Sequence, residues 1–225
     1  MKREKKVVMV IVEGPSDENA IGCVLKEHFS SKEVQFAVVH GDITSDFATT
    51  KDNVLIKIGD KVEEIRNKYG YRPDDFVSII HITDTDGAFT KDCIRQSGVK
   101  DIQYYEDHIE TDDVSKVEKR NKHKSEILSK LYSIGKVKDI NYRIYFNSCN
   151  LEHVLYDELK NFTDEEKHTL SDDFAEEYEG EVEAFIEFIS NPDFAVIDTY
   201  KNTWRFIEKD MNSLHRHSNM HLIFK

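Results

Sequence analysis

Short apolar runs separate segments of helical periodicity through the first two thirds of the chain. The run at residues 7–12 is continuously apolar and mostly β-branched, and similar runs occupy residues 34–39 and 76–83. Residues 141–146 alternate between polar and apolar side chains. Continuous apolar runs of this length are typical of strands that are buried on both faces, as in a parallel sheet. We therefore predict four strands.

The segments that follow these runs have the spacing of amphipathic helices. Ser16 can cap a helix after the first run, and residues 54–69 repeat apolar side chains every three or four positions. Residues 112–132 and 151–156 predict two further helices, whereas the stretch 88–111 predicts no element. The order strand, helix, strand, helix, strand favours an α/β fold with a mostly parallel central sheet.

Only helical patterns follow the fourth strand. They cover residues 164–178, 181–190 and 199–212. We therefore expect two parts, an α/β domain at residues 1–156 and a helical C-terminal extension at residues 157–225 that packs on it.

The composition favours a globular protein but excludes a uniformly basic nucleic-acid coat protein. Hydrophobic residues make up 39% of the 225 residues, and the net charge is −13. The three cysteines lack the spacing of a zinc site or a disulfide framework, which is typical of a reducing cytoplasm. No apolar stretch approaches the length of a membrane span, so we expect a cytoplasmic protein without a membrane partner.

One local stretch reverses the overall charge. Residues 116–143 contain nine Lys and Arg against three acids, a net charge of +6. A solvated helix face would explain this pattern, and so would contact with a phosphate backbone. For the second interpretation we expect five side chains at the start of the stretch to bind nucleic acid: Lys116, Lys119, Arg120, Lys122 and Lys124.

Carboxylates follow three of the predicted strands. Glu13 follows the first strand, Asp84 and Asp86 follow the third, and Glu152 comes shortly after the fourth. Asp17 lies one helical turn beyond Glu13. Because the carboxyl ends of parallel strands meet at one edge of the sheet, we expect these side chains to gather there. Acids are also favoured at helix N-termini and in turns, which is the alternative explanation of the same residues.

Clustered carboxylates repel one another unless a cation neutralises them. A ligand set made only of oxygen atoms favours Mg²⁺ or Mn²⁺ over zinc. One or two such ions polarise a phosphate and orient a water molecule, which is the chemistry of phosphodiester hydrolysis. The sequence therefore predicts a magnesium site at this edge of the sheet.

Two motifs resemble those of a known family. Glu-Gly after a hydrophobic strand, in Ile11-Val-Glu-Gly-Pro-Ser-Asp17, and a later strand that ends in Asp-x-Asp, in Ile82-Thr-Asp-Thr-Asp-Gly87, are similar to the Toprim fold. This fold occurs in topoisomerases, bacterial primases, small RNA-maturation nucleases and OLD-family nucleases. The resemblance covers roughly residues 6–156 and implies a Rossmann-like parallel sheet that binds Mg²⁺ through Glu13, Asp84 and Asp86. No third acid follows the Asp-x-Asp pair closely, which disfavours a topoisomerase or a primase.

Among Toprim proteins, the chain looks most like the nuclease components of the OLD and RloB-like groups. Those groups include partners of ATPases in bacterial anti-phage systems of the AbiL and PARIS types. The resemblance implies that Asp17 and Glu152 complete a second metal position. It also implies a role in phage defence and an ATPase partner on a separate chain, since no P-loop motif is present. A homodimer is the other assembly that we consider.

We therefore expect a Mg²⁺-dependent Toprim-type nuclease that hydrolyses phosphodiester bonds of DNA or RNA. The expected catalytic residues are Glu13, Asp17, Asp84 and Asp86. The expected metal ligands are Glu13, Asp84, Asp86 and Glu152.

Two alternatives remain open at this point. The first is a catalytically silent Toprim scaffold that docks onto a partner ATPase or a translation component. Residues 157–187, with a net charge of −11, would be its docking surface, although the solvated face of packed helices explains the same residues. The second is a phosphotransfer or nucleotide-binding enzyme that uses the same acids on a small substrate.

Overall fold

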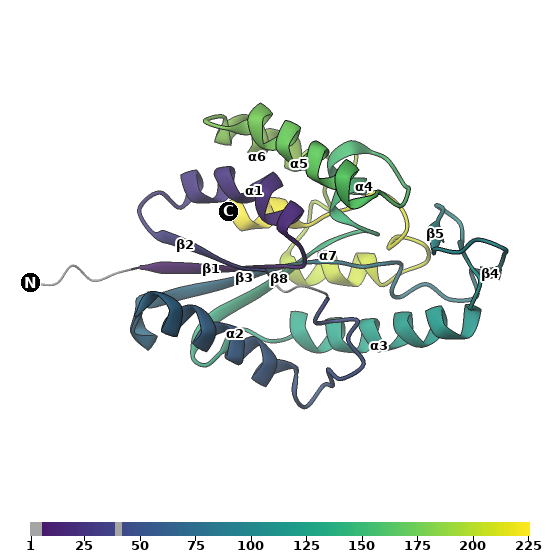
Figure 1. Cartoon of the computed structure of the whole chain (residues 1–225), viewed down its shortest axis with the longest axis horizontal. Coiled ribbons are helices and arrows are strands. Elements are labelled where there is room, and N and C mark those ends of the chain that lie inside the picture. The colour runs from purple at the N-terminus through teal and green to yellow at the C-terminus, as the bar shows by residue number, and fades with distance from the viewer. Residues whose placement is uncertain (1–5, 39–41) are drawn as a thin grey trace, which may run out of the picture.

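A five-stranded, mostly parallel sheet forms the centre of the fold (Figure 1). The computed structural model describes residues 6–38 and 42–225. The strand order is β2–β1–β3–β8–β7, with strands β1 Val7–Val12, β2 Glu33–Val38, β3 Phe76–Asp84, β7 Lys136–Val137 and β8 Ile140–Asn147. Strands β2, β1, β3 and β8 run parallel, and β7 pairs antiparallel with β8. The predicted Rossmann-like α/β class is confirmed.

The central position of strand β1 in the sheet explains why its sequence is apolar without interruption. It pairs with β2 on one side and with β3 on the other, and all six of its side chains are buried. Alternate side chains of a strand point to opposite faces, so both faces of the sheet must be covered by helices. Position 39, the predicted last residue of the second strand, lies outside the described residues.

Two helical layers cover the sheet, one on each face (Figure 1). One layer comprises α2 Val54–Tyr69, α3 Val114–Tyr132 and α7 Tyr200–Ile207. The other comprises α1 Pro15–His28, α4 Leu151–Tyr156, α5 Asp164–Tyr178 and α6 Val182–Ile189. Within the described residues, no helix combines the length and the apolarity needed to cross a bilayer.

Residues 157–225 contribute to both hydrophobic cores. Trp204 of α7 packs in the core on one face, and Phe185 of α6 packs in the core on the other. Ser218 forms isolated β-bridges with Asn147 and Ala195, and a short 3₁₀ helix, η2 Met220–Phe224, ends the chain. The three predicted C-terminal helices are confirmed, although the last one ends at Ile207.

The stretch without predicted elements forms a small three-stranded sheet at one end of the molecule (Figure 1). Its strands are β4 Ile94–Gln96, β5 Gln103–Tyr104 and β6 Ile109–Thr111, in the order β4–β6–β5. It packs against α3 through a third apolar cluster that includes Ile109 and Val117. Strands of two or three residues are too short to give a recognisable alternation in the sequence. Another short element, the 3₁₀ turn η1 Pro73–Asp75, precedes β3.

The chain reverses its direction of travel across the sheet between β1 and β3. The connection through α1 leads from β1 to β2, whereas the connection through α3 leads from β3 to β8, on the opposite side. In open parallel sheets, the carboxyl ends of the two strands at such a switch point form a crevice that binds ligands. Here those ends carry Glu13 and Asp84.

Candidate functional site

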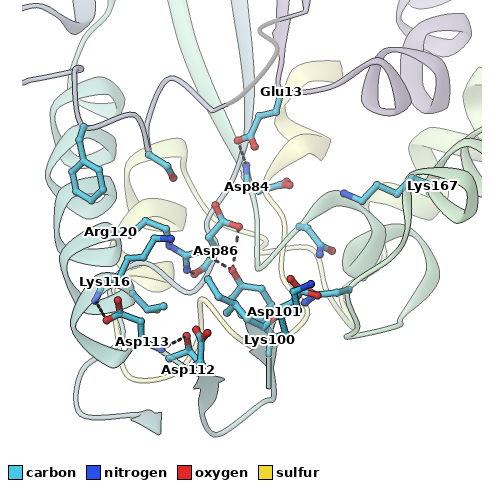
Figure 2. Close-up of a pocket in the computed structure, with 18 residues that line it drawn as sticks. Glu13, Asp84, Asp86, Lys100, Asp101, Asp112, Asp113, Lys116, Arg120 and Lys167 are labelled. Atoms are coloured by element: carbon cyan, nitrogen blue, oxygen red, sulfur yellow. Dashed lines mark hydrogen bonds between the residues drawn. The ribbon is translucent and has the colours of Figure 1, made fainter. Parts of the chain in front are cut away.

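Glu13 and Asp84 lie side by side at the switch point (Figure 2). The Oε1 atom of Glu13 accepts hydrogen bonds from the Thr83 hydroxyl and from the Asp84 backbone N–H, both at 3.0 Å. Within residues 6–38 and 42–225, no group donates a hydrogen bond to Glu13 Oε2 or to the carboxylate of Asp84. The two acids therefore keep oxygen atoms available for a ligand.

Asp17 shapes the turn that presents Glu13. It is the third residue of α1, and its Oδ2 accepts the backbone N–H groups of Glu13 at 3.1 Å and Gly14 at 2.9 Å. Pro15 begins the helix, where a missing N–H carries no penalty. The structure thus gives Asp17 a positioning role behind Glu13, and its predicted catalytic role stays a prediction.

Asp86 is bound to a buried lysine. The ammonium of Lys124 contacts the Oδ2 atoms of Asp86 and Asp42, the latter at 2.5 Å, and lies 3.9 Å from Glu13 Oε1. The Lys124 side chain is 0% exposed. Its nitrogen occupies the kind of position, between carboxylates, that a metal ion would take.

The placement of Lys124 corrects one sequence-based expectation. We expected Lys124 to contact nucleic acid from an exposed helix face, but it points into the protein from α3. A lysine is buried in this way only when carboxylates compensate the loss of hydration, and those carboxylates come from two distant loops. A count of charges along the sequence does not contain that information.

The other predicted basic residues of α3 separate into different environments. Lys116 and Arg120 line the cleft that contains Glu13, Asp84 and Asp86. Lys122 borders a separate depression beside Phe89 and Asp92, and Lys119 is exposed outside both. A single continuous basic patch is therefore not formed.

Arg120 is used mainly to hold the Asp86 loop. It donates to the backbone carbonyl of Asp86 at 2.9 Å, to Tyr104 Oη at 3.1 Å and to Asn121 Oδ1. Tyr104 in turn lies 3.4 Å from Asp86 Oδ1. Asp86 has a left-handed backbone conformation with φ of 50°, and these contacts from α3 and β5 support that turn.

Glu152 pairs with a lysine that the sequence had not singled out. Glu152 Oε1 lies 3.1 Å from Lys167 Nζ, and the Glu152 side chain is 7% exposed. Figure 2 shows the Lys167 side chain reaching from α5 toward Asp84. As a metal ligand Glu152 stays a prediction, since in the structure its charge is balanced by Lys167.

Asp42 is the acidic residue that the sequence analysis missed. Its Oδ1 accepts the N–H and the hydroxyl of Thr44, and its Oδ2 accepts from Ser45 and Lys124. Asp42 comes four positions after the end of β2, and the carboxyl ends of parallel strands meet at one edge of the sheet. The reasoning that selected Glu13 and Asp84 therefore applies to Asp42 as well.

The electrostatics divide the site into two halves. Around Lys124 the charges are compensated: burial alone would raise the pKa of Asp42, but the Lys124 ammonium outweighs it and lowers that pKa to about 2. Burial would lower the pKa of Lys124, but Asp42, Asp86 and Glu13 hold it well above its usual value. At Glu13 and Asp84, in contrast, no cation outweighs burial, so the charged form of each carboxyl is disfavoured. Burial and then Glu13 raise the pKa of Asp84, and burial and then Asp42 raise the pKa of Glu13.

A cleft of about 750 Å³ opens onto these carboxylates (Figure 2). Lys100 and Lys116 line it and form no ion pair with any described residue. Phe47, another lining residue, is 59% exposed although its loop is braced by the hydrogen bond between His123 and the Asp46 carbonyl. The cleft therefore offers cations and two aromatic residues, of which Phe47 is exposed and Tyr104 is buried.

The donor set at Glu13 and Asp84 fits a magnesium ion that keeps most of its water. No three Asp, Glu, His or Cys side chains within the described ranges are arranged to hold a metal together. Mg²⁺ is commonly bound by one or two carboxylates, with waters and substrate phosphates as the remaining ligands, so two available acids suffice. The Lys124 ammonium also shows that this cluster accommodates a cation.

Comparisons of this chain with family models, with curated proteins and with solved structures give no match.

Proposed function

We propose that this protein is a Mg²⁺-dependent nuclease that hydrolyses phosphodiester bonds of DNA or RNA. The observation that carries the proposal is the pair Glu13 and Asp84, which neighbour each other at the switch point and keep carboxylate oxygens free of hydrogen bonds from the described residues. The cleft that they line also contains Lys100 and Lys116, which form no ion pair with any described residue. The resemblance to Toprim nucleases rests on motifs that contain these two acids, which supports the same conclusion. The role in phage defence and the ATPase partner come from the resemblance and stay predictions.

The residues of the cleft would divide the work of binding and chemistry. Glu13 and Asp84 would hold the ion, which supplies a Lewis acid for the phosphate and favours ionisation of a water molecule. Lys100 and Lys116 reach the cleft as mobile point charges and would neutralise neighbouring phosphates. The exposed ring of Phe47 would stack against a base, an interaction available only when that base is unpaired.

Cleavage should require a divalent cation. We expect the purified chain to cut at least one of plasmid DNA, single-stranded DNA and bulk tRNA in Mg²⁺ or Mn²⁺, and to lose this activity in EDTA. Gel analysis of end-labelled substrates measures the products. A chain that stays inert on every substrate with both ions would contradict the proposal and favour the catalytically silent scaffold. Equal cleavage in EDTA would also contradict it.

Lys116→Ala should weaken the electrostatic part of substrate binding. Because Lys116 lines the cleft, we expect the slope of log(kcat/KM) against log salt concentration to become shallower by about 1. Lys119→Ala is the matched control, since Lys119 is an exposed lysine of the same helix outside the cleft. Equal slopes for the two variants would show that Lys116 does not meet a phosphate.

A further inference from the structure

The two acids of the Asp84-Thr85-Asp86 sequence occupy different environments. The Asp86 carboxylate is engaged by the Lys124 ammonium and by Tyr104 Oη, and its backbone carbonyl by Arg120. The Asp84 carboxylate accepts no hydrogen bond from residues 6–38 and 42–225. Two acids two positions apart in the sequence therefore differ in whether they are available to a ligand.

Thr85 and the backbone of this loop keep the two carboxylates apart. The Thr85 N–H donates to the Asn147 carbonyl and the Asp86 N–H donates to the Cys149 carbonyl, each at 2.9 Å. The Thr85 hydroxyl donates to the Ser213 carbonyl at 3.1 Å and accepts from the Cys149 N–H. Since Thr85 is fully buried, the loop cannot easily rotate to bring Asp86 beside Asp84.

Lys124 fills the space in which Asp42 and Asp86 would otherwise share a metal ion. Its ammonium contacts both carboxylates and lies 3.9 Å from Glu13 Oε1. A metal ion at the same place would have to displace a fully buried lysine from both ion pairs and leave its charge without a partner in the interior. Breaking a buried pair in this way is strongly unfavourable.

We infer that the site is built for one divalent cation, held by Glu13 and Asp84, and that the Lys124 ammonium permanently takes the place of a second ion beside Asp42 and Asp86. The inference rests on the proposed function, because it assigns the ligands of the ion that the function requires. It separates two residues that the Toprim resemblance treats alike: Asp84 is a metal ligand, and Asp86 is a positioning residue that acts through Lys124.

Titration with Mn²⁺ alone, without substrate, tests this division. The electron paramagnetic resonance signal of free Mn²⁺ gives both the number of bound ions and their affinity. We expect one ion for the wild-type chain, a loss of affinity of at least about 100-fold for Asp84→Asn, and a much smaller loss, of about 10-fold, for Asp86→Asn, which acts on the ion only through its neighbours. Lys124→Met should create a second binding position, because Asp42 and Asp86 then lack a cation.

The results of this titration distinguish a failure of the single-ion assignment from a failure of the proposed nuclease function. Two ions bound by the wild-type chain, or an equal loss of affinity for Asp84→Asn and Asp86→Asn, would overturn the single-ion assignment and leave a metal-dependent nuclease intact. No bound ion at millimolar Mn²⁺ would overturn both. Circular dichroism confirms folding of each variant, and if Lys124→Met does not fold, the comparison of the two Asn variants decides the question.

Discussion

Asp84→Asn should abolish cleavage and at the same time make the metal-free protein more stable. Because Asp84 is proposed to hold the catalytic ion, we expect kcat/KM in Mg²⁺ to fall by at least about 10³-fold. Without metal, the charged Asp84 carboxylate destabilises the fold, since burial and then Glu13 disfavour its charged form and raise its pKa. Its removal should therefore raise the free energy of unfolding in EDTA at pH 8.

The pH dependence of this gain follows from the direction of the pKa shift. A folded-state pKa above the unfolded value means that charged Asp84 destabilises the fold at high pH, and that the penalty fades as pH falls through the raised pKa toward the ordinary one. The stability advantage of Asp84→Asn over wild type should thus be largest near pH 8 and shrink on acidification. Urea unfolding of both proteins at several pH values measures it.

Asp112→Asn is the matched control for Asp84→Asn. Asp112 lines the same cleft and is exposed, so its substitution should leave the rate within a few-fold and the stability within about 0.5 kcal/mol. Cleavage by Asp84→Asn at more than a tenth of the wild-type rate would refute the assigned site. An Asp84→Asn protein less stable than wild type in EDTA would refute the electrostatic account.

Lys124→Met should destabilise the protein more than any exposed lysine substitution. The variant keeps the aliphatic bulk of the side chain but leaves Asp42 and Asp86 without their buried cation. Removing one partner of a buried ion pair costs about 3–5 kcal/mol. We expect a loss of that size in the free energy of unfolding at pH 8 in EDTA, measured by urea denaturation.

Substituting Asp42 and Asp86 together with Lys124 shows whether Lys124→Met destabilises the protein through unpaired charge or through altered packing. The triple variant Asp42→Asn/Asp86→Asn/Lys124→Met carries no unpaired charge in this half of the site and should recover most of the stability. Lys122→Met, on the exposed side of the same helix, should change it by no more than about 0.5 kcal/mol. If Lys124→Met is insoluble, recovery of soluble protein by the triple variant gives the same answer. A loss below about 1 kcal/mol for Lys124→Met, or no recovery in the triple variant, would contradict the role of Lys124.

The sequence predicted the central sheet well because the signal for its strands is strong. Residues 7–12 are apolar at every position, and the structure buries all of them between two neighbouring strands. The helix at Val54–Tyr69 was predicted with its observed bounds, since its apolar positions follow a clear helical period and Gly70 ends it in the left-handed conformation. In contrast, the small sheet β4–β6–β5 is held by tertiary contacts of short segments, which leave no periodic pattern.

The sequence also indicated where acids gather, but not what each one does. The rule that parallel strands end at a common edge placed Glu13 and Asp84 together, and the structure brings them within hydrogen-bonding distance through the Asp84 N–H. Applied to β2, the same rule would have selected Asp42. Asp17 and Glu152 also lie near this edge, where the backbone of the β1–α1 turn and the Lys167 ammonium respectively occupy their carboxylates.

By itself, the sequence determined the α/β class, the four parallel strands of the central sheet and the edge at which its acids collect, because these depend on local apolar periods and on the parallel order of the strands. The two-residue edge strand β7 was not predicted, since so short a segment carries no period. Only the tertiary structure decided that Lys124 turns inward between Asp42 and Asp86 while Asp84 keeps its oxygens available. The physical reason is that the energy of a buried charge depends on which other charges surround it in space. Those charges come from loops after β2 and β3 and from the middle of α3, segments far apart along the chain.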